Sequence, residues 1–312
     1  MTSQERIEKY KKKGAKIGKN VKIGEGTEIN FKKLEIGDNT EVGNNCYIDC
    51  ESLKLGKLNK IGNNAQITCK DVEIGDVLFT SDNIVIGGAE AKGPYSKFKM
   101  GRLGFIGWDA LINTTKEVNI GNNVCIGPRA MIYTHGHWQS VLEGYYAARS
   151  NVTINNDVWI GTNVVVLPGV NIGKGSTVTV NSVVLSRIPD NCLVTGNPGR
   201  IIKRPYPTPP TTRQKERIMD TIMEELVVQF KYKGFPSEKN NNTIKTKFLD
   251  YNVFIEYDIK RIIIKFKNFD VVFDLNKKVI NGKQNNLTDE IRELLRKYGI
   301  KFEPYLWRYL PP

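Results

Sequence analysis

The two histidines of the chain are its clearest candidates for chemistry. His135 and His137 stand two residues apart in the segment IYTHGHWQSVLEGYY, and Trp138 follows them. An imidazole takes up and releases a proton near neutral pH, so a histidine in such a segment can act as a general base. Both histidines also lie where a regular repeat ends and a long irregular segment begins. We therefore expect a catalytic role rather than local hydrogen bonding alone.

Metal binding is not favoured by these residues. A catalytic zinc site needs three protein ligands, and the two histidines supply only two. The five cysteines are odd in number and include no Cys-x-x-Cys pair, so they predict small buried thiols in a reducing compartment. They are Cys46, Cys50, Cys69, Cys125 and Cys192. The sequence predicts no metal site.

Composition narrows the class of protein further. The chain has 312 residues, a net charge of +13, and 40% hydrophobic and 25% charged residues, which is typical of a globular protein. No basic stripe is interleaved with aromatic residues, so nucleic-acid binding is not expected. No apolar run reaches the ~20 residues that cross a bilayer. The N-terminal residues lack the apolar core of a signal peptide, and we expect a cytoplasmic protein without a membrane span.

Internal repetition dominates the first two thirds of the chain. A period of six fits neither an α-helix nor the two-residue alternation of a simple strand. Three hexads instead make one triangular coil, in which an aliphatic side chain points inward and a glycine often turns the corner. Stacked coils bury a continuous aliphatic column. The aliphatics recur at steps of six, six and seven: Ile17, Ile23, Ile29, Ile36, Val42, Ile48, Leu55, Ile61, Ile67 and Ile74.

Two segments interrupt this repeat. Residues 87–103, GGAEAKGPYSKFKMGRL, are polar and contain glycines, and a second irregular segment runs from about 135 to 151. Long loops on a rigid scaffold often carry function, which agrees with the histidines in the second segment. Beyond it the aliphatics are again six residues apart, at Ile154, Ile160, Val166, Ile172, Val178 and Val184.

The composition changes after Lys203. We expect four parts: an N-terminal extension (1–14), a β-helix domain (15–203), a Pro-rich linker (204–212) and a C-terminal α+β domain (213–312). No catalytic motif marks the C-terminal domain, and its role is left open.

Within the C-terminal domain, apolar spacing and turn residues predict helices, strands and loops. Thr288 is the expected cap of the last helix. The predicted elements are a helix over 213–230, a loop over 237–246, strands over 252–257, 261–266 and 270–275, and a helix over about 288–298.

Residues 152–203 carry a recognisable set of motifs. VWIG, LPGV, an I-P step and the ending GNPGRIIK stand there in order. This sequence resembles the terminal coils of hexapeptide-repeat acyltransferases, and it looks most like the maltose and galactoside O-acetyltransferases and the surface-polysaccharide acetyltransferases. The resemblance implies a mainly β fold, a left-handed parallel β-helix of hexapeptide repeats, to which a small C-terminal α+β domain is added. It also implies a homotrimer with active sites between neighbouring chains and coenzyme A along the outer edge of the coils.

The resemblance assigns the general base to His137. In the maltose and galactoside enzymes the catalytic histidine lies nine residues after a proline of the preceding corner, and here His137 follows Pro128 at that distance. Counting back from Trp159 permits His135 instead, so His135 stays the alternative. We expect the histidine that is not the base to orient the loop or to contact substrate.

The resemblance also assigns residues to acetyl-CoA, the expected co-substrate. In the family, backbone groups and small side chains contact the pantetheine arm, and basic residues meet the nucleotide phosphates. Ser186 stands where the family often has lysine, and Asn181 where it often has glycine, so the phosphate contacts depart from the pattern. The matching positions are Gly161, Thr162, Thr179, Val180, Leu185, Ser186, Arg200 and Lys203.

For the acceptor, the related enzymes place an asparagine just before an aromatic residue, in the coil that precedes the histidine loop. Here Gly107 precedes the aromatic residue, so this contact is lost or moved. The acceptor-binding candidates are Trp108, Asp109, Asn113, Trp138 and Glu143.

The sequence therefore predicts an enzyme that moves an acetyl or other short acyl group from coenzyme A to a hydroxyl of a sugar or nucleotide-sugar, in polysaccharide biosynthesis. Two alternatives stay open. One is N-acetylation of an amino-sugar, and the other is a non-catalytic trimeric scaffold whose C-terminal domain binds a partner. A zinc-type hydratase on the same fold is disfavoured by the histidine count.

Overall fold

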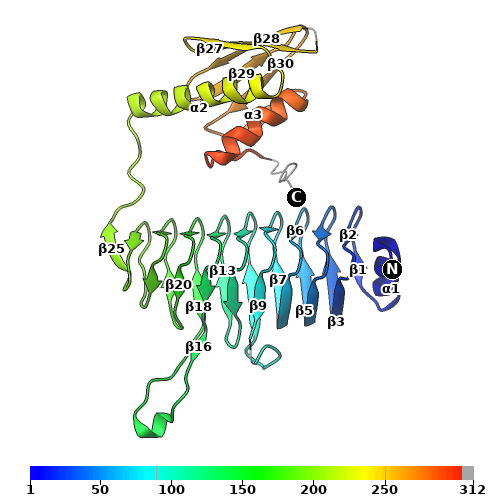
Figure 1. Cartoon of the computed structure of the whole chain (residues 1–312), viewed down its shortest axis with the longest axis vertical. Coiled ribbons are helices and arrows are strands. Elements are labelled where there is room, and N and C mark those ends of the chain that lie inside the picture. Colours follow the sequence, from blue (N-terminus) through cyan, green and yellow to red (C-terminus); the bar gives the residue numbers. More distant parts are fainter. Residues whose placement is uncertain (89, 250, 304–312) are drawn as a thin grey trace. The chain divides into compact units, whose positions relative to one another are not determined.

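The computed structural model describes residues 1–88, 90–249 and 251–303. The chain divides into two compact units, Met1–Thr208 and Pro209–Pro312. The first unit is a parallel β-helix with one N-terminal helix, and the second is a small α+β unit (Figure 1). The predicted fold class, a parallel β-helix of hexapeptide repeats followed by an α+β domain, is confirmed.

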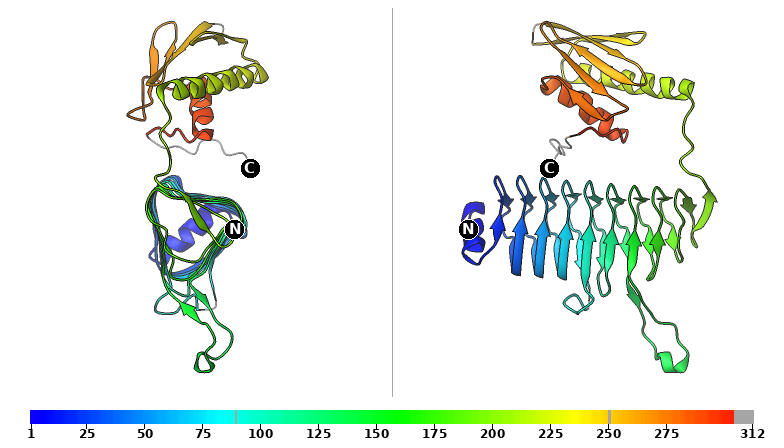
Figure 2. Two further views of the ribbon diagram at one scale, coloured as in Figure 1. Left: turned by 90° about the vertical axis from the view of Figure 1, so that its left-hand side faces the viewer. Right: turned by 180° about the vertical axis from the view of Figure 1, so that it is seen from behind.

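The β-helix is a three-sided prism of short strands (Figure 2). Its sheets are named here face I, face II and face III, and the corner between two of them is an edge, such as edge I–II. Face I consists of β2 (Lys22–Ile23), β4 (Glu41–Val42), β6 (Lys60–Ile61), β8 (Phe79–Thr80), β11 (Phe105–Ile106), β14 (Cys125–Ile126), β19 (Trp159–Ile160), β22 (Thr177–Val178), β24 (Leu193–Thr195) and the antiparallel β25 (Arg200–Lys203).

The other two faces share three strands that bend around edge II–III: β3 (Glu28–Ile36), β5 (Tyr47–Leu55) and β7 (Gln66–Ile74). Face II continues from their first halves with β9 (Val85–Gly87), β12 (Leu111–Asn113), β15 (Met131–Ile132), β20 (Val165–Val166) and β23 (Val183–Val184). Face III contains β1 (Lys16–Ile17), their second halves, β10 (Lys97–Met100), β13 (Val118–Ile120), β18 (Val152–Ile154) and β21 (Asn171–Ile172).

The hexad pattern explains this geometry. Strands of two or three residues leave one aliphatic side chain pointing inward on each face, and the predicted inward residues Ile23, Ile61, Ile126, Ile160 and Ile172 are at most 1% exposed. The step of seven residues falls at edge II–III, where the bent strands turn. At the other corners the backbones of neighbouring coils touch. A Cβ on Gly37 would lie 2.6 Å from the carbonyl carbon of Gly56, so only glycine fits there.

The first predicted interruption is shorter than expected. The loop that leaves the prism ends at Ser96, and the following residues KFKM form β10, with Phe98 and Met100 buried in the core. The prediction that 87–103 lies wholly outside the repeat is therefore wrong. The reason is that Phe98 and Met100 fill inward positions that the search for branched aliphatics passed over.

A helix covers the N-terminal end of the prism, where the sequence predicted only an extension. Helix α1 (Ser3–Lys12) begins with a capping box between Thr2 and Glu5. Its side chains Ile7 and Tyr10 join the core of the first coil. The backbone N–H of Ile29 donates to the Tyr10 hydroxyl at 3.0 Å. The helix thus covers apolar surface and a backbone donor that an open coil end would expose to water (Figure 1).

The C-terminal unit packs two helices against one antiparallel sheet. Helices α2 (Thr212–Tyr232) and α3 (Asn286–Lys297) bury their apolar stripes in the same core as the inner face of the sheet. The strands follow one another in chain order: β26 (Ser237–Asn240), β27 (Thr243–Phe248), β28 (Tyr251–Tyr257), β29 (Arg261–Lys265), β30 (Asp270–Asp274) and β31 (Val279–Asn281).

Two local predictions in this unit are wrong. Residues 237–246 form most of the hairpin β26–β27 rather than a loop, because the buried Ser237 hydroxyl donates to Thr246 Oγ1 at 2.7 Å and replaces an apolar pair. The N-cap of α3 is Asn285 and not Thr288. The Asn285 side chain accepts the backbone N–H of Thr288, which is the third residue of the helix.

Candidate active site

The histidines lie on a hairpin that leaves the prism at edge II–III. Strand β16 (His135–Gly136) pairs with β17 (Ala148–Arg149), so that His135 stands opposite Arg149. The 3₁₀ turn η1 (Val141–Glu143) lies between these strands. The ring centroids of His135 and His137 are 5.9 Å apart. The structure thus brings the two predicted catalytic candidates together on one side of the molecule.

The exposure of the hairpin side chains differs sharply. His135 is half-buried against the prism, whereas His137 and Glu143 are exposed. Trp138 is 91% exposed. A large aromatic side chain in water at this position is available for contact with a ligand or another chain.

Asn113 lies beneath the hairpin. It ends β12 and is only 6% exposed. Its Oδ1 accepts the Thr134 hydroxyl at 2.7 Å and lies 2.9 Å from Nδ1 of His135. The backbone N–H of Thr115 also donates to this oxygen at 3.3 Å. The predicted acceptor-binding side chain of Asn113 therefore contacts the protein itself, and it supports His135.

A second loop holds the hairpin from outside. The loop between β9 and β10, described here for Gly88 and for residues 90–96, leaves the prism at the same edge, one coil earlier than the sharp turn at 114–117. Glu90 of this loop forms an ion pair with Arg149. Sequence reasoning missed both residues, because neither belongs to a hexad or to a recognisable motif and they are 59 positions apart.

Trp108 and Asp109 lie on a different edge. They follow β11 and precede β12, which places them at edge I–II, and both are exposed. The guanidinium carbon of Arg129, on the next coil, lies 4.9 Å from the Trp108 ring centroid. A Cβ on Gly107 would lie 2.4 Å from the backbone nitrogen of Pro128. The stacked coils thus leave no room at position 107 for the asparagine that the resemblance led us to look for.

The first four predicted coenzyme residues share edge I–II with Trp108. Gly161 and Thr162 follow β19, and Thr179 and Val180 follow β22. A Cβ on Gly161 would lie 2.8 Å from the backbone nitrogen of Val180, so coil stacking requires glycine there whatever else it contacts. The Val180 side chain is 56% exposed.

The remaining coenzyme candidates lie elsewhere on the last coils. Leu185 and Ser186 follow β23 at edge II–III, and both are exposed. Arg200 and Lys203 begin and end β25, which pairs with β24 on face I. Between them Ile201 and Ile202 are also exposed, and sequence reasoning passed over these two apolar side chains.

Apart from Arg200 and Lys203 on face I, the predicted residues therefore fall on two edges of the same prism. The histidine hairpin, Leu185 and Ser186 lie at edge II–III, whereas Trp108, Gly161 and Val180 lie at edge I–II. Face II separates the two edges. In a single chain the histidines do not face these edge I–II residues.

Comparisons with known proteins find similarity to acetyltransferases over part of the chain. A putative acetyltransferase of Saccharomyces cerevisiae is 45% identical over 91 residues, which cover 28% of this chain and 46% of that protein. The galactoside O-acetyltransferase of Escherichia coli is 34% identical over 115 residues, which cover 35% of this chain and 54% of that protein. Over these segments the chain resembles acetyltransferases, among them a galactoside O-acetyltransferase.

The extent of this similarity is limited. No family model matches the chain. A hexapeptide-repeat acetyltransferase structure from Vibrio cholerae is 27% identical, with a TM-score of 0.36, and the match covers 45% of this chain and 75% of that one. The chain spans about half the length of the curated relatives it matches.

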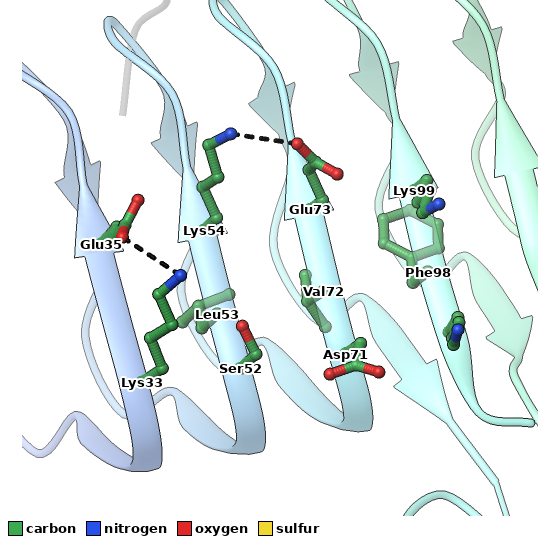
Figure 3. Close-up of a pocket in the computed structure, with 11 residues that line it drawn as sticks. Lys33, Glu35, Ser52, Leu53, Lys54, Asp71, Val72, Glu73, Phe98 and Lys99 are labelled. Atoms are coloured by element: carbon green, nitrogen blue, oxygen red, sulfur yellow. Dashed lines mark hydrogen bonds and ion pairs between the residues drawn. The ribbon is translucent and has the colours of Figure 1, made fainter. Parts of the chain in front are cut away.

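The hexapeptide-repeat unit also has a pocket of about 300 Å³ on face III, lined by β3, β5, β7 and β10 (Figure 3). Its outward side chains alternate in charge, with Lys33 paired to Glu35 at 3.5 Å and Lys54 paired to Glu73 at 3.1 Å. None of the predicted site residues lines it. Such exposed ion pairs suit a sheet face that stays in contact with water.

Two further observations bear on this hexapeptide-repeat protein. Across residues 1–88, 90–249 and 251–303, no three His, Cys, Asp or Glu side chains are grouped so that they could hold a metal ion. Within the same ranges, no helix has both the length and the apolar character needed to cross a membrane.

Four of the five cysteines are buried, as predicted, and Cys125 is half-buried. Burial, together with the neighbouring Cys69, raises the pKa of the Cys50 thiol to about 12. A thiol in that state is a poor nucleophile at neutral pH.

Proposed function

We propose that the protein is an acetyl-CoA-dependent O-acyltransferase that acts on a hydroxyl of a sugar or nucleotide-sugar, with His137 as the general base. The observation that carries this proposal is the exposed imidazole of His137 on a hairpin of a hexapeptide-repeat prism. The position nine residues after Pro128 favours His137 over His135.

The proposed reaction needs one proton acceptor and one activated acyl group. An imidazole nitrogen of His137 removes the proton from the acceptor hydroxyl as its oxygen attacks the thioester carbonyl carbon. The carbon–sulfur bond then breaks, and the proton passes from the imidazolium to the departing coenzyme A sulfur. The acceptor leaves as an ester and coenzyme A as a free thiol. No metal takes part in this scheme.

The coenzyme would lie along the last coils. Val180 and Leu185 offer exposed apolar surface to the pantetheine arm, beside Gly161, Thr162, Thr179 and Ser186. Arg200 and Lys203 are exposed cations that can meet the phosphates. Apart from Arg200 and Lys203, these residues lie on different edges of the prism. When two chains bind to each other, an edge of one chain would meet a different edge of the other.

A homotrimer would complete each site. In one chain the histidine hairpin is at edge II–III, and Trp108, Gly161 and Val180 are at edge I–II. If face II of one chain packs beside its neighbour, the hairpin of one protomer can reach edge I–II of the next. The outward side chains support this choice of face. Face III carries the paired charges of Figure 3, whereas the outward row of face II begins with Glu28, Tyr47 and Gln66 and is apolar from there on, at Val85, Leu111, Met131, Val165 and Val183.

The acceptor would contact exposed residues around this shared site. Trp108, with Arg129 over its ring, offers an aromatic face of the kind that packs against sugar rings. Asp109, Trp138 and Glu143 are exposed and stay candidates. The proposal also includes a cytoplasmic location and a role in polysaccharide biosynthesis. The name of one relative, a putative lipopolysaccharide biosynthesis O-acetyl transferase of Escherichia coli, refers to such a pathway.

An acceptor screen tests the proposed function. Full-length protein is incubated with acetyl-CoA and one of galactose, maltose, N-acetylglucosamine, glucosamine or UDP-N-acetylglucosamine, and the free thiol released is measured. We expect thiol release that depends on a sugar hydroxyl, with an acetyl ester in the product. An acetamide from glucosamine would establish N-transfer instead. No sugar-dependent release from any of them would contradict the proposal and favour a non-catalytic scaffold.

A further inference from the structure

We propose that Asn113 is a positioning residue that fixes the tautomer of His135 and presents the Nε2 atom of His135 to the acceptor as a hydrogen-bond acceptor. The role toward the acceptor rests on the proposed function, whereas the tautomer does not. The proposal names a contact that the acceptor must satisfy: a second hydroxyl or N–H group beside the hydroxyl that is acylated.

The argument starts with the identity of the atom that faces His135. The backbone N–H of Thr115 donates to the Asn113 side chain at 3.3 Å, and a backbone N–H can only donate. The atom it meets is therefore the carboxamide oxygen and not the nitrogen. The Thr134 hydroxyl agrees with this orientation. It accepts the backbone N–H of Lys116 at 3.0 Å, so its own hydrogen is free to donate to Asn113 Oδ1 at 2.7 Å.

The tautomer of His135 follows from that oxygen. Nδ1 of His135 lies 2.9 Å from Asn113 Oδ1, and an oxygen without a hydrogen can only accept. Nδ1 must therefore carry a proton. In a neutral imidazole the other nitrogen, Nε2, is then an acceptor. Because Asn113 is only 6% exposed, water has little access to compete for this contact.

Glycine and an ion pair hold the arrangement in place. A Cβ on Gly88 would lie 2.2 Å from Nδ2 of Asn113, so the loop backbone packs directly on the carboxamide. Arg149, the cross-strand neighbour of His135, is paired with Glu90 of the same loop. The imidazole is thus supported from beneath by Asn113 and from its neighbouring strand by a tethered residue.

The role of Nε2 follows from the position of His137. The two rings are 5.9 Å apart between centroids and tilted by 58°, which is too far for one ring to replace the other but close enough for one ligand to touch both. An acceptor that gives a proton to His137 can place an adjacent hydroxyl on His135 Nε2. A sugar with neighbouring hydroxyls meets this requirement, and a simple alcohol does not.

Nitrogen-15 NMR tests the tautomer without any substrate. The chain has only two histidines, so a long-range proton–nitrogen spectrum of the labelled protein contains two imidazoles. His137→Gln assigns them. We expect His135 to show protonated Nδ1 and unprotonated Nε2 in the wild type and in Asn113→Asp, which keeps an oxygen at the same place. We expect Asn113→Leu and Gly88→Ala to give a tautomer mixture. A protonated Nε2 in the wild type would overturn the proposal, even if a variant fails to fold.

Kinetics test the role of Nε2, with the best sugar of the acceptor screen. Asn113→Leu and His135→Leu should each raise KM for the sugar about tenfold, the effect of one lost hydrogen bond to a ligand, with kcat changed less. Asn113→Asp should restore the wild-type KM. The double variant should be no worse than His135→Leu alone, because Asn113 acts through His135. Additive effects of the two substitutions would overturn the proposal. Loss of transfer in the wild type itself would instead contradict the proposed function.

Discussion

Glu90 and Arg149 form an ion pair that joins the two loops leaving the prism at edge II–III. Arg149 stands opposite His135 in the hairpin, so Glu90 ties its loop to the strand that pairs with the one carrying His135. The hexad pattern predicts the stacked coils, but it does not predict this ion pair. The position of the histidines therefore depends on contacts between segments that are distant in the sequence.

Glu90→Gln should loosen the histidine hairpin without unfolding the prism. Both side chains are partly exposed, and such pairs contribute about 0.2–1 kcal/mol, so we expect proteolytic cleavage within 136–147 to accelerate by a factor of about 1.5–5. Lys174→Gln is the matched control, since it removes another exposed ion pair, to Asp157, on a different edge. Equal cleavage rates in both variants would show that the pair does not restrain the hairpin.

Ile160→Asp should unfold the β-helix. Ile160 is 0% exposed, and an unpaired carboxylate there costs several kcal/mol. Asn171→Asp puts the same carboxylate on an outward position of β21 and should change the melting temperature little. Thermal unfolding followed by circular dichroism gives the melting temperature of each variant. Similar melting temperatures for the two variants would contradict the inward assignment of position 160.

The proposed sharing of the site between chains predicts complementation. Val180→Glu on edge I–II and His137→Ala on edge II–III should each lower thiol release about a hundredfold or more as separate proteins. Co-expressed in equal amounts, they should recover about a quarter of wild-type activity, because one site in four would combine two intact edges. Differently tagged chains verify that mixed trimers form. Mixed trimers with no recovered activity would place each site within one chain.

The C-terminal unit should lose stability in acid through Asp220. The Tyr257 hydroxyl donates to Asp220 Oδ1 at 2.6 Å and, together with Lys239, holds the pKa of this carboxyl below its usual value. A depressed pKa in the folded state gives stability that is present above the unfolded-state pKa of about 3.9 and is lost as pH falls through the folded-state value.

Urea unfolding between pH 7 and pH 3, followed by pulsed hydrogen exchange of α2, measures this loss. Tyr257→Phe should flatten the dependence of stability on pH. Tyr251→Phe should leave it unchanged, because Tyr251 is more than half exposed and lies at the end of the hairpin. A wild-type pH dependence in Tyr257→Phe would mean that the hydrogen bond to Asp220 does not carry the effect.

The sequence predicted most of the prism, because inward aliphatics such as Ile160 recur at a period of six, which fits neither an α-helix nor an alternating strand. It failed where other side chains filled the same positions, as Phe98 does in β10. It also failed where polar groups satisfied one another, as Ser237 and Thr246 do between two strands. Local composition cannot reveal such pairs, since their partner is set by the tertiary structure.

The sequence likewise predicted only part of the candidate site. His135 and His137 could be located from the sequence because they are the only histidines and interrupt the repeat. The contact between Asn113 and His135 could not be predicted from the sequence. It joins the end of strand β12 to the start of a hairpin 22 residues later. The placement of Trp108 on another edge also required the structure.

Turnover of matched histidine variants tests the central claim most directly. The wild type, His137→Ala and His135→Ala are compared for thiol release from acetyl-CoA with the best sugar acceptor, and acetyl-CoA binding is measured by calorimetry. Loss of a positioned base typically costs ~10²–10⁴ in rate, so His137→Ala should lower kcat by that order while acetyl-CoA binds as before. His135→Ala should lower kcat far less. If His137→Ala turned over at the wild-type rate, the mechanism proposed for this protein would be contradicted.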